Sequence, residues 1–228
     1  MNDHVHDLAS VRDATDRLLT AAARLDNADL AGPSRLPGWT RGHVLAHLSR
    51  NADALVNVLA GRPMYESETA RDEDIERDAP RGAAEQLADL RASALRLEEQ
   101  AALTTDWSRT VELRNGITDS ASGVPFRRLI EVELHHVDLD AGYELEDLPG
   151  AFVERETGFL TARFEGHPEV VPVRITADGR SWTTGGGAGG GTVEVSGTAA
   201  EVMGWLAGRR DGTALAVTGG TLPPLPPL

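Results

Sequence analysis

Hydrophobic residues in the first two-thirds of the chain recur at the spacing of amphipathic helices. The pattern predicts four helices, over about residues 7–26, 40–60, 81–103 and 124–142. Thr40 is a plausible N-cap for the second helix, which the Gly-Arg-Pro sequence at 61–63 should end. The breaker-rich segment 31–38 reads as a loop, as does Asn115-Gly116. An acidic stretch with little to bury should form a surface loop or short helix over 66–78.

The fourth predicted helix differs from the others in how its apolar residues are arranged. Between Phe126 and Leu139 they surround the helix instead of forming one stripe, which is typical of a largely buried helix. The same segment carries Glu131, Glu133 and His135, followed by further ionisable residues. Buried charges persist only when they are paired or bound to a metal. This helix is therefore the first place to look for a site.

The pattern changes after Pro149, where shorter elements begin. Helices are expected over about 151–165 and 199–207, and strands over about 172–176, 181–183, 193–196 and 214–217. Asp178-Gly179 is a turn signal between the first two strands. Thr198 and Glu201 fit a capping box at the start of the second helix.

The glycine-rich segment 185–191 lacks the Lys-Ser/Thr of a phosphate-binding loop, so it reads as a linker. The proline-rich end, 222–228, should be extended. Together the elements predict an α+β protein with two domains. A four-helix bundle occupies residues 1–148, and a small α+β domain occupies 149–228.

Composition excludes several classes of partner and mechanism. The net charge of -14 and the pI of about 4.9 argue against nucleic acid and anionic membranes as partners, although a local arginine cluster can still hold a small anion. The chain has no lysine, which excludes Schiff-base chemistry. It has no cysteine either, which excludes disulfides, zinc–thiolate sites and a cysteine nucleophile. Because the N-terminus is unlike a signal peptide and no apolar run approaches the length of a membrane span, a cytoplasmic protein is expected.

Two pairs of residues have the spacing of metal ligands. His43 and His47 are four residues apart on the second predicted helix, and Glu131 and His135 are four apart on the fourth. Residues at this spacing share one helical face. Two inward-facing helices can therefore present several ligands at one point, although such pairs are also common on solvated helix surfaces. Two histidines and one carboxylate suit zinc and leave a coordination position open.

Longer segments of the chain resemble the mycothiol-dependent maleylpyruvate isomerases, a family of the wider DinB-like metal-binding bundles. The resemblance rests on PGWTRGHVLAHL at 37–48 with RNADAL at 50–55, and on RLIEVELHHVDL at 128–139. Near the end, WLAGR at 205–209 and the proline-rich terminus resemble the family's sterol-carrier-protein-like domain. The similarity extends over nearly the whole chain in order.

The resemblance implies roles for individual residues. The metal ligands of the family fall on His47, Glu131 and His135. His43 matches a position that is common in the family without being a ligand, so it is expected to pack, to cap the helix or to support a ligand. His136 is about 100° from His135 around the helix, so the two cannot face one metal. Among the nearby ionisable residues, Asp138 could orient an imidazole, anchor an arginine or cap part of the structure, and Glu133 is expected to be paired or exposed.

The family reaction that the resemblance implies is the isomerisation of maleylpyruvate to fumarylpyruvate with the thiol cofactor mycothiol. Thiolate addition makes the double bond single, and rotation and elimination then give the trans product. A divalent metal, preferably zinc, would activate the thiol. Arg209 is the predicted catalytic residue for the substrate carboxylates, and the arginines available for this task are Arg41, Arg50, Arg127, Arg128 and Arg209.

Two other functions stay open at this point. One is a mycothiol-dependent S-transferase or another thiol-adding enzyme. The other is a non-catalytic metal-binding module. For all three functions the expected partners are small molecules. The isomerase and the S-transferase would also use a low-molecular-weight thiol.

Overall fold

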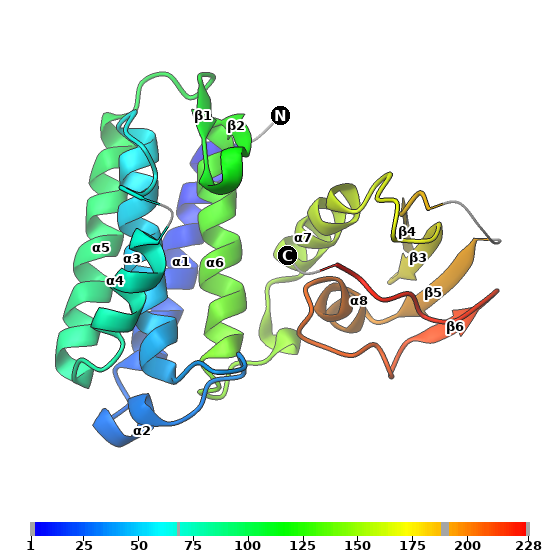
Figure 1. Ribbon diagram of the computed structural model, residues 1–228, viewed down its shortest axis with the longest axis horizontal. Helices are drawn as coiled ribbons and strands as arrows, with labels where there is room; N and C mark the ends of the chain where they lie inside the picture. Colours follow the sequence, from blue (N-terminus) through cyan, green and yellow to red (C-terminus); the bar gives the residue numbers. More distant parts are fainter. Residues whose placement is uncertain (1–2, 68, 188–191, 227–228) are drawn as a thin grey trace. The chain divides into compact units, whose positions relative to one another are not determined.

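The computed structural model describes residues 3–67, 69–187 and 192–226. It divides into two compact units, Met1–Tyr143 and Glu144–Leu228 (Figure 1). The first unit is helical and the second contains a sheet, so the predicted α+β class is confirmed. Within the described part of the chain, no helix is both long and apolar enough to cross a membrane.

Four long helices form the first unit. They are α1 (His4–Ala22), α3 (Arg41–Leu59), α5 (Ala83–Leu103) and α6 (Val124–Asp138). α1 packs mainly against α6, and α3 packs mainly against α5 and also contacts α6 (Figure 1). The four helices are those that the sequence pattern predicts. Their apolar faces meet in a core of leucine, valine and alanine side chains that places α3 and α6 side by side.

The ends of two helices differ from the prediction. α1 ends at Ala22 and not near 26, and α6 ends at Asp138 and not near 142. Beyond α6, Asp140 and Gly142 have left-handed backbone conformations, with φ of 54° and 86°, which cannot continue a right-handed helix. The apolar pattern runs past the helix because Leu139, which follows α6 and precedes the left-handed Asp140, is still buried.

Two of the shorter elements in the first unit were not predicted, and a third was one of two alternatives. Helix α2 (Asn27–Ala31) begins at a capping box between Asp26 and Asp29. Strands β1 (Thr110–Glu112) and β2 (Thr118–Ser120) form an antiparallel hairpin. The expected turn at Asn115-Gly116 lies within it, and both residues have positive φ. Between α3 and α5, α4 (Ala70–Asp78) shows that the acidic segment is a short helix.

The second unit is a four-stranded sheet with two helices. α7 (Gly150–Arg163) precedes β3 (Val173–Ala177), β4 (Arg180–Thr184) and β5 (Val193–Gly197), and α8 (Ala199–Leu206) precedes β6 (Ala216–Thr218). The strand order is β4-β3-β5-β6, with β3 parallel to β5 and the other pairs antiparallel. α8 packs against α7 and against the central strands.

Local signals in the second unit were read correctly from the sequence. Asp178 and Gly179 have φ of 48° and 78°, as a tight hairpin turn requires. The Thr198 hydroxyl accepts a hydrogen bond from the backbone N–H of Glu201 at 3.2 Å and caps α8. This is one half of the predicted capping box, and the Glu201 carboxylate pairs with Arg210. Residues 188–191 of the predicted linker and residues 227–228 of the predicted extended tail lie outside the described residues.

Candidate metal centre

Two helices bring three ligand atoms to one point in the first unit. α3 carries His47, and α6 carries Glu131 and His135 one turn apart. The Nε2 atoms of His47 and His135 lie 2.9 and 3.2 Å from Oε2 of Glu131. One potential ligand atom of each residue lies within 4.8 Å of those of the other two. The three residues that the family resemblance implies as ligands thus share one point between α3 and α6.

A buried carboxylate fixes the ring of His135. Oδ2 of Asp138 lies 2.8 Å from Nδ1 of His135, and the Asp138 side chain is 1% exposed. Among the roles expected for Asp138, this contact bears out the orientation of an imidazole. A carboxylate at Nδ1 fixes the orientation of the ring, so that Nε2 faces Glu131 and His47.

Burial separates the protonation properties of the two imidazoles. Desolvation, together with the neighbouring His135, lowers the pKa of His47 to about 4. Desolvation also disfavours the charged form of His135, but its hydrogen bonds to Asp138 and Glu131 outweigh this and raise its pKa. Burial alone would raise the pKa of Glu131, yet the hydrogen bonds from both histidines hold it well below its usual value. At neutral pH His47 is neutral and Glu131 anionic, which are the forms that bind a metal.

Close packing of α4 against α3 builds the open side of the centre. A Cβ atom on Gly42 would lie 2.3 Å from the carbonyl oxygen of Ala79, so only glycine permits this approach. The buried Gln86 side chain donates to the carbonyl oxygens of Gly42, Asp78 and Ala79 and fastens the end of α4 to α3. This contact fixes the helix on which Arg71 lies.

Arg71 and two aromatic residues stand next to the three ligand atoms, and the sequence reasoning missed all of them. Nη2 of Arg71 lies 3.3 Å from Nδ1 of His47, and its guanidinium carbon is 6.0 Å from the centre of the Trp39 ring. The Trp39 and His47 rings are 5.6 Å apart. Desolvation raises the pKa of Tyr65, against the opposing effect of Arg71. The segment that carries Arg71 and Tyr65 has no regular spacing of apolar residues that could have marked it. Trp39 lies in the segment 37–48 that resembles the family.

A pocket of about 1110 Å³ opens beside Tyr65. It lies between the segment after α3 and the β1–β2 hairpin. Its charged and polar lining residues are Arg62, Ser67, Arg109, Thr110, Glu112, Arg114 and Asn115. Tyr65 belongs to its wall and also interacts with Arg71, so the pocket adjoins the centre.

The two other histidines of the motifs have separate roles. His43 caps α3, because its Nδ1 accepts a hydrogen bond from the Thr40 backbone N–H at 3.2 Å while Thr40 Oγ1 accepts from the His43 N–H. The capping role weighed for His43 is the one observed. His136 stacks on Tyr143 with ring centres 4.0 Å apart, and it is not a member of the three-residue group.

Most of the arginines considered as substrate anchors are engaged elsewhere. Arg41 bonds the carbonyl oxygen of Leu139 and pairs with Asp140, Arg50 pairs with Asp53, Asp78 and Asp89, and Arg127 pairs with Asp119. Arg128 is buried and donates to Leu48 and Asn51. Glu133, expected to be paired or exposed, is paired with Arg17 at 2.6 Å.

Arg209, the predicted catalytic residue, belongs to the second unit. It follows α8, and its Nη1 donates to the carbonyl oxygen of Ala207 at 2.8 Å. The adjacent Arg210 instead forms ion pairs with Glu146 and Glu201. The two neighbouring arginines therefore differ in their contacts, and the catalytic role of Arg209 stays a prediction.

Two family models match the chain, one for each part. The model described as the mycothiol maleylpyruvate isomerase N-terminal domain matches residues 11–140, and the model described as the MDMPI C-terminal domain matches residues 147–227. Together they take in both compact units. No curated protein sequence gives a significant match.

Solved structures give the same result in three dimensions. The chain is similar to a crystal structure of the mycothiol-dependent maleylpyruvate isomerase, with a TM-score of 0.90 and 27% sequence identity. The match covers 99% of this chain and 97% of the other. A crystal structure of a histidine-to-alanine mutant of a mycothiol-dependent maleylpyruvate isomerase matches with the same values.

Proposed function

The chain belongs to the mycothiol maleylpyruvate isomerase family, and from this premise we propose that it catalyses the mycothiol-dependent cis–trans isomerisation of maleylpyruvate to fumarylpyruvate. The observation that carries the proposal is the convergence of His47, Glu131 and His135 in a fold that matches the isomerase over 99% of the chain. Both solved relatives are isomerases, which supports this reaction over the S-transferase and the non-catalytic module.

We infer that His47, Glu131 and His135 hold one divalent metal, preferably zinc. The donor set fits, since it consists of two imidazole nitrogens and one carboxylate oxygen, with Asp138 orienting one ring. When bound, a metal with three protein ligands and an open position would lower the pKa of a thiol and polarise a carbonyl group. Mycothiol supplies the sulfur that a chain without cysteine lacks.

The protein's own contribution to the reaction is to bind and orient the substrate beside the centre. Arg71 is the cation closest to the ligand atoms, and guanidinium groups bind carboxylates through paired hydrogen bonds. The Arg71 guanidinium donates to Nδ1 of His47 at 3.3 Å. If Nε2 of His47 held a metal, its ring proton would lie on Nδ1, and the guanidinium of Arg71 would be free to bind a substrate carboxylate.

The polar pocket beside Tyr65 provides room for the cofactor. Its volume of about 1110 Å³ exceeds what a small keto diacid needs, and its lining is rich in arginine and other hydrogen-bonding side chains. Because Tyr65 also interacts with Arg71, a thiol that reaches from this pocket comes close to the substrate anchor. We infer that mycothiol occupies this pocket.

Proton NMR of maleylpyruvate tests the proposed reaction, because the cis and trans vinyl protons have different shifts. Metal-loaded protein with mycothiol should convert the signals to those of fumarylpyruvate, whereas His47→Ala should not. Absence of turnover with metal and mycothiol both present would overturn the assignment. Sustained turnover with no thiol would remove the thiol from the mechanism while leaving the isomerase in place.

A further inference from the structure

A second pocket, of about 480 Å³, opens between α1 and α5. Among the described residues it shares no lining side chain with the metal centre or with the pocket beside Tyr65. Its size is within the range of small-molecule sites. The established family reaction gives it no task.

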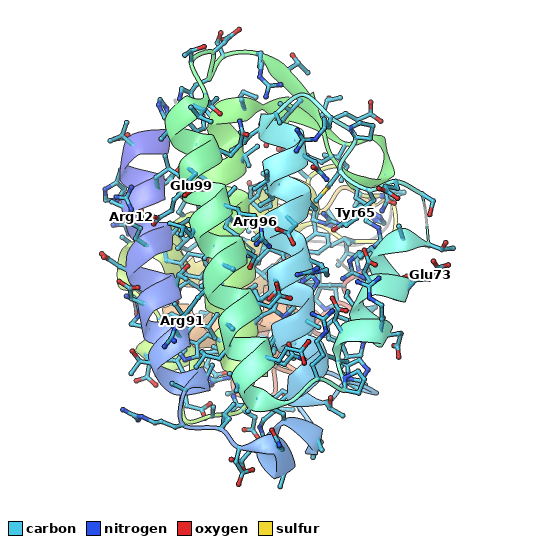
Figure 2. All side chains as sticks on the ribbon, turned by 90° about the vertical axis from the view of Figure 1, so that its left-hand side faces the viewer. Arg12, Tyr65, Glu73, Arg91, Arg96 and Glu99 are labelled. Carbon is cyan, nitrogen blue, oxygen red and sulfur yellow. The ribbon has the colours of Figure 1, made fainter. Side chains whose placement is uncertain are left out.

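The pocket exists because the seam between these helices is incompletely filled. α1 packs mainly on α6 and α5 mainly on α3, so α1 and α5 meet less closely. The α5 side of the seam carries the small side chains Ala94, Ala101 and Ala102. Figure 2 shows this face, with Arg12 labelled on α1 and Arg91 labelled on α5.

The walls of the pocket are hydrophobic and partly open to solvent. The aliphatic lining residues are Val5, Leu8, Val11, Leu19, Leu59, Leu95 and Leu97. Two of them, Val5 and Leu95, are 68% and 55% exposed, which is costly for side chains of this size. The stacked rings of His4 and Trp107, 4.3 Å apart, add an aromatic part to the wall.

A buried arginine also lines this apolar pocket. Arg128 is 1% exposed, and its Nη1 donates to the Leu48 carbonyl oxygen at 2.9 Å and to Asn51 Oδ1 at 2.8 Å. Its Nη2 is buried and has no hydrogen-bond partner among the residues that the structure describes. In the same set of residues, no carboxylate forms an ion pair with Arg128. A buried cation with an unused donor is an anchor for an anion.

The remaining charges on the lining favour the same kind of ligand. Arg12 pairs with Glu98 at 2.9 Å, so these two largely cancel. Asp16 and Arg91 offset each other in formal charge, which leaves Arg128 as the excess charge. A net positive lining stands out in a chain with a net charge of -14.

We propose that this pocket binds a small amphipathic carboxylate, with its hydrocarbon part between α1 and α5 and its carboxylate on Nη2 of Arg128. The apolar walls distinguish this ligand from maleylpyruvate, which has no hydrocarbon body of this kind. The site goes beyond the proposed isomerase function and does not depend on it.

Calorimetric titration of the metal-loaded, full-length protein with octanoate and with 1-octanol tests both parts of the proposal. Octanoate should bind at one saturable site, at least about tenfold more tightly than the alcohol. Equal affinity for the two would overturn the role of Arg128. Absence of saturable octanoate binding would overturn the site itself.

Matched variants on α5 locate the binding. Ala94→Trp fills the pocket and should weaken octanoate binding by about tenfold or more, whereas Ala92→Trp places the same side chain on the exposed surface of α5 and should not. Equal effects of the two would place the octanoate elsewhere.

Arg128→Met should abolish the preference for octanoate over octanol, and the variant should still bind the alcohol. A retained preference in a folded variant, judged by circular dichroism, would contradict the anchor. If this variant does not fold, the comparison of the two ligands and the two tryptophan variants still decide the proposal.

Discussion

The two imidazoles of the candidate centre are held by contacts of opposite character. Nδ1 of His135 faces the carboxylate of Asp138, which accepts a hydrogen bond from it. Nδ1 of His47 faces the guanidinium of Arg71, which can only donate a hydrogen bond. His135 is therefore oriented for metal binding before the metal arrives. His47 must exchange its contact with Arg71 when Nε2 binds the metal. This difference gives each residue its own expected phenotype.

Removing an imidazole of the centre should abolish metal binding. We expect purified His47→Ala and His135→Ala to contain almost no metal by elemental analysis, because two ligands alone hold a divalent ion poorly. His43→Ala and His136→Ala serve as controls and should keep most of it, since one caps α3 and the other stacks on Tyr143. Loss of metal from His136→Ala with retention in His135→Ala would refute the ligand assignment.

Metal binding should release protons in a pattern set by the two histidine pKa values. The pKa of His135 is raised, so the metal must displace its proton in mildly acidic solution, while the pKa of His47, about 4, keeps that ring neutral there. Affinity should fall about tenfold per pH unit below the pKa of His135. At a pH below the pKa of His135, titration calorimetry in buffers of different ionisation enthalpy should show the release of one proton per metal ion bound. Release of two would mean that His47 is also protonated.

Arg71 should matter for substrate affinity and not for metal content. Losing a charged hydrogen bond of about 1.5–3 kcal/mol predicts a rise in KM for maleylpyruvate of roughly 10- to 100-fold in Arg71→Gln. Arg77→Gln is the matched control, because Arg77 lies on the same helix and pairs with Asp74 and Asp78. Steady-state kinetics on metal-loaded proteins measures both. An unchanged KM in Arg71→Gln would remove Arg71 from substrate binding and leave Arg209 as the predicted anchor.

How far the sequence could predict the site depended on periodicity. The spacing of Glu131 and His135, on a helix that is apolar all round, pointed to the centre, and the family resemblance selected His47 over His43. Arg71 lies in an acidic stretch with no apolar period, so only the packing of Gly42 against Ala79 brings it to the site. A close approach of this kind leaves no mark in a hydrophobic pattern.

Among the elements of the first unit, the long helices were predictable from the sequence, whereas helix α2 and the β1–β2 hairpin were not. Each long helix of the bundle repeats its apolar face over several turns, which makes the pattern strong. Helix α2 has a single buried residue, Leu30, and the two strands of the β1–β2 hairpin bury only Val111. Such elements are stabilised by caps and tertiary contacts rather than by a repeating face.

The start of α3 offers a test at this scale, because two side chains cap it reciprocally. Thr40→Ala should lower the free energy of unfolding by about 0.5–2 kcal/mol without changing metal content. His43→Ala should have a similar effect. The double variant should lose less free energy of unfolding than the two single variants together, since each side chain bonds the other residue's backbone. Urea unfolding measures all three variants, and strictly additive losses would contradict a shared cap.

For the whole molecule, the sequence predicted two parts of different architecture. The helical unit supplies all three candidate ligands, and the second unit carries Arg209 in a segment that resembles the family's own C-terminal domain. Metal binding should thus be a property of the first unit and full activity a property of the whole chain. The neighbouring arginines of the second unit make this division testable without truncation.

Arg209→Ala and Arg210→Ala should therefore have different consequences. The proposed role of Arg209 in holding a substrate carboxylate predicts a loss of roughly 10- to 100-fold in kcat/KM with unchanged metal content, and only partial rescue by Arg209→Lys. Arg210 pairs with Glu146 and Glu201, so its replacement should lower the thermal stability and leave the kcat/KM of the folded enzyme nearly intact. Kinetics together with thermal unfolding separates the two effects. Wild-type activity in Arg209→Ala would remove this residue from the reaction and leave Arg71 as the substrate anchor.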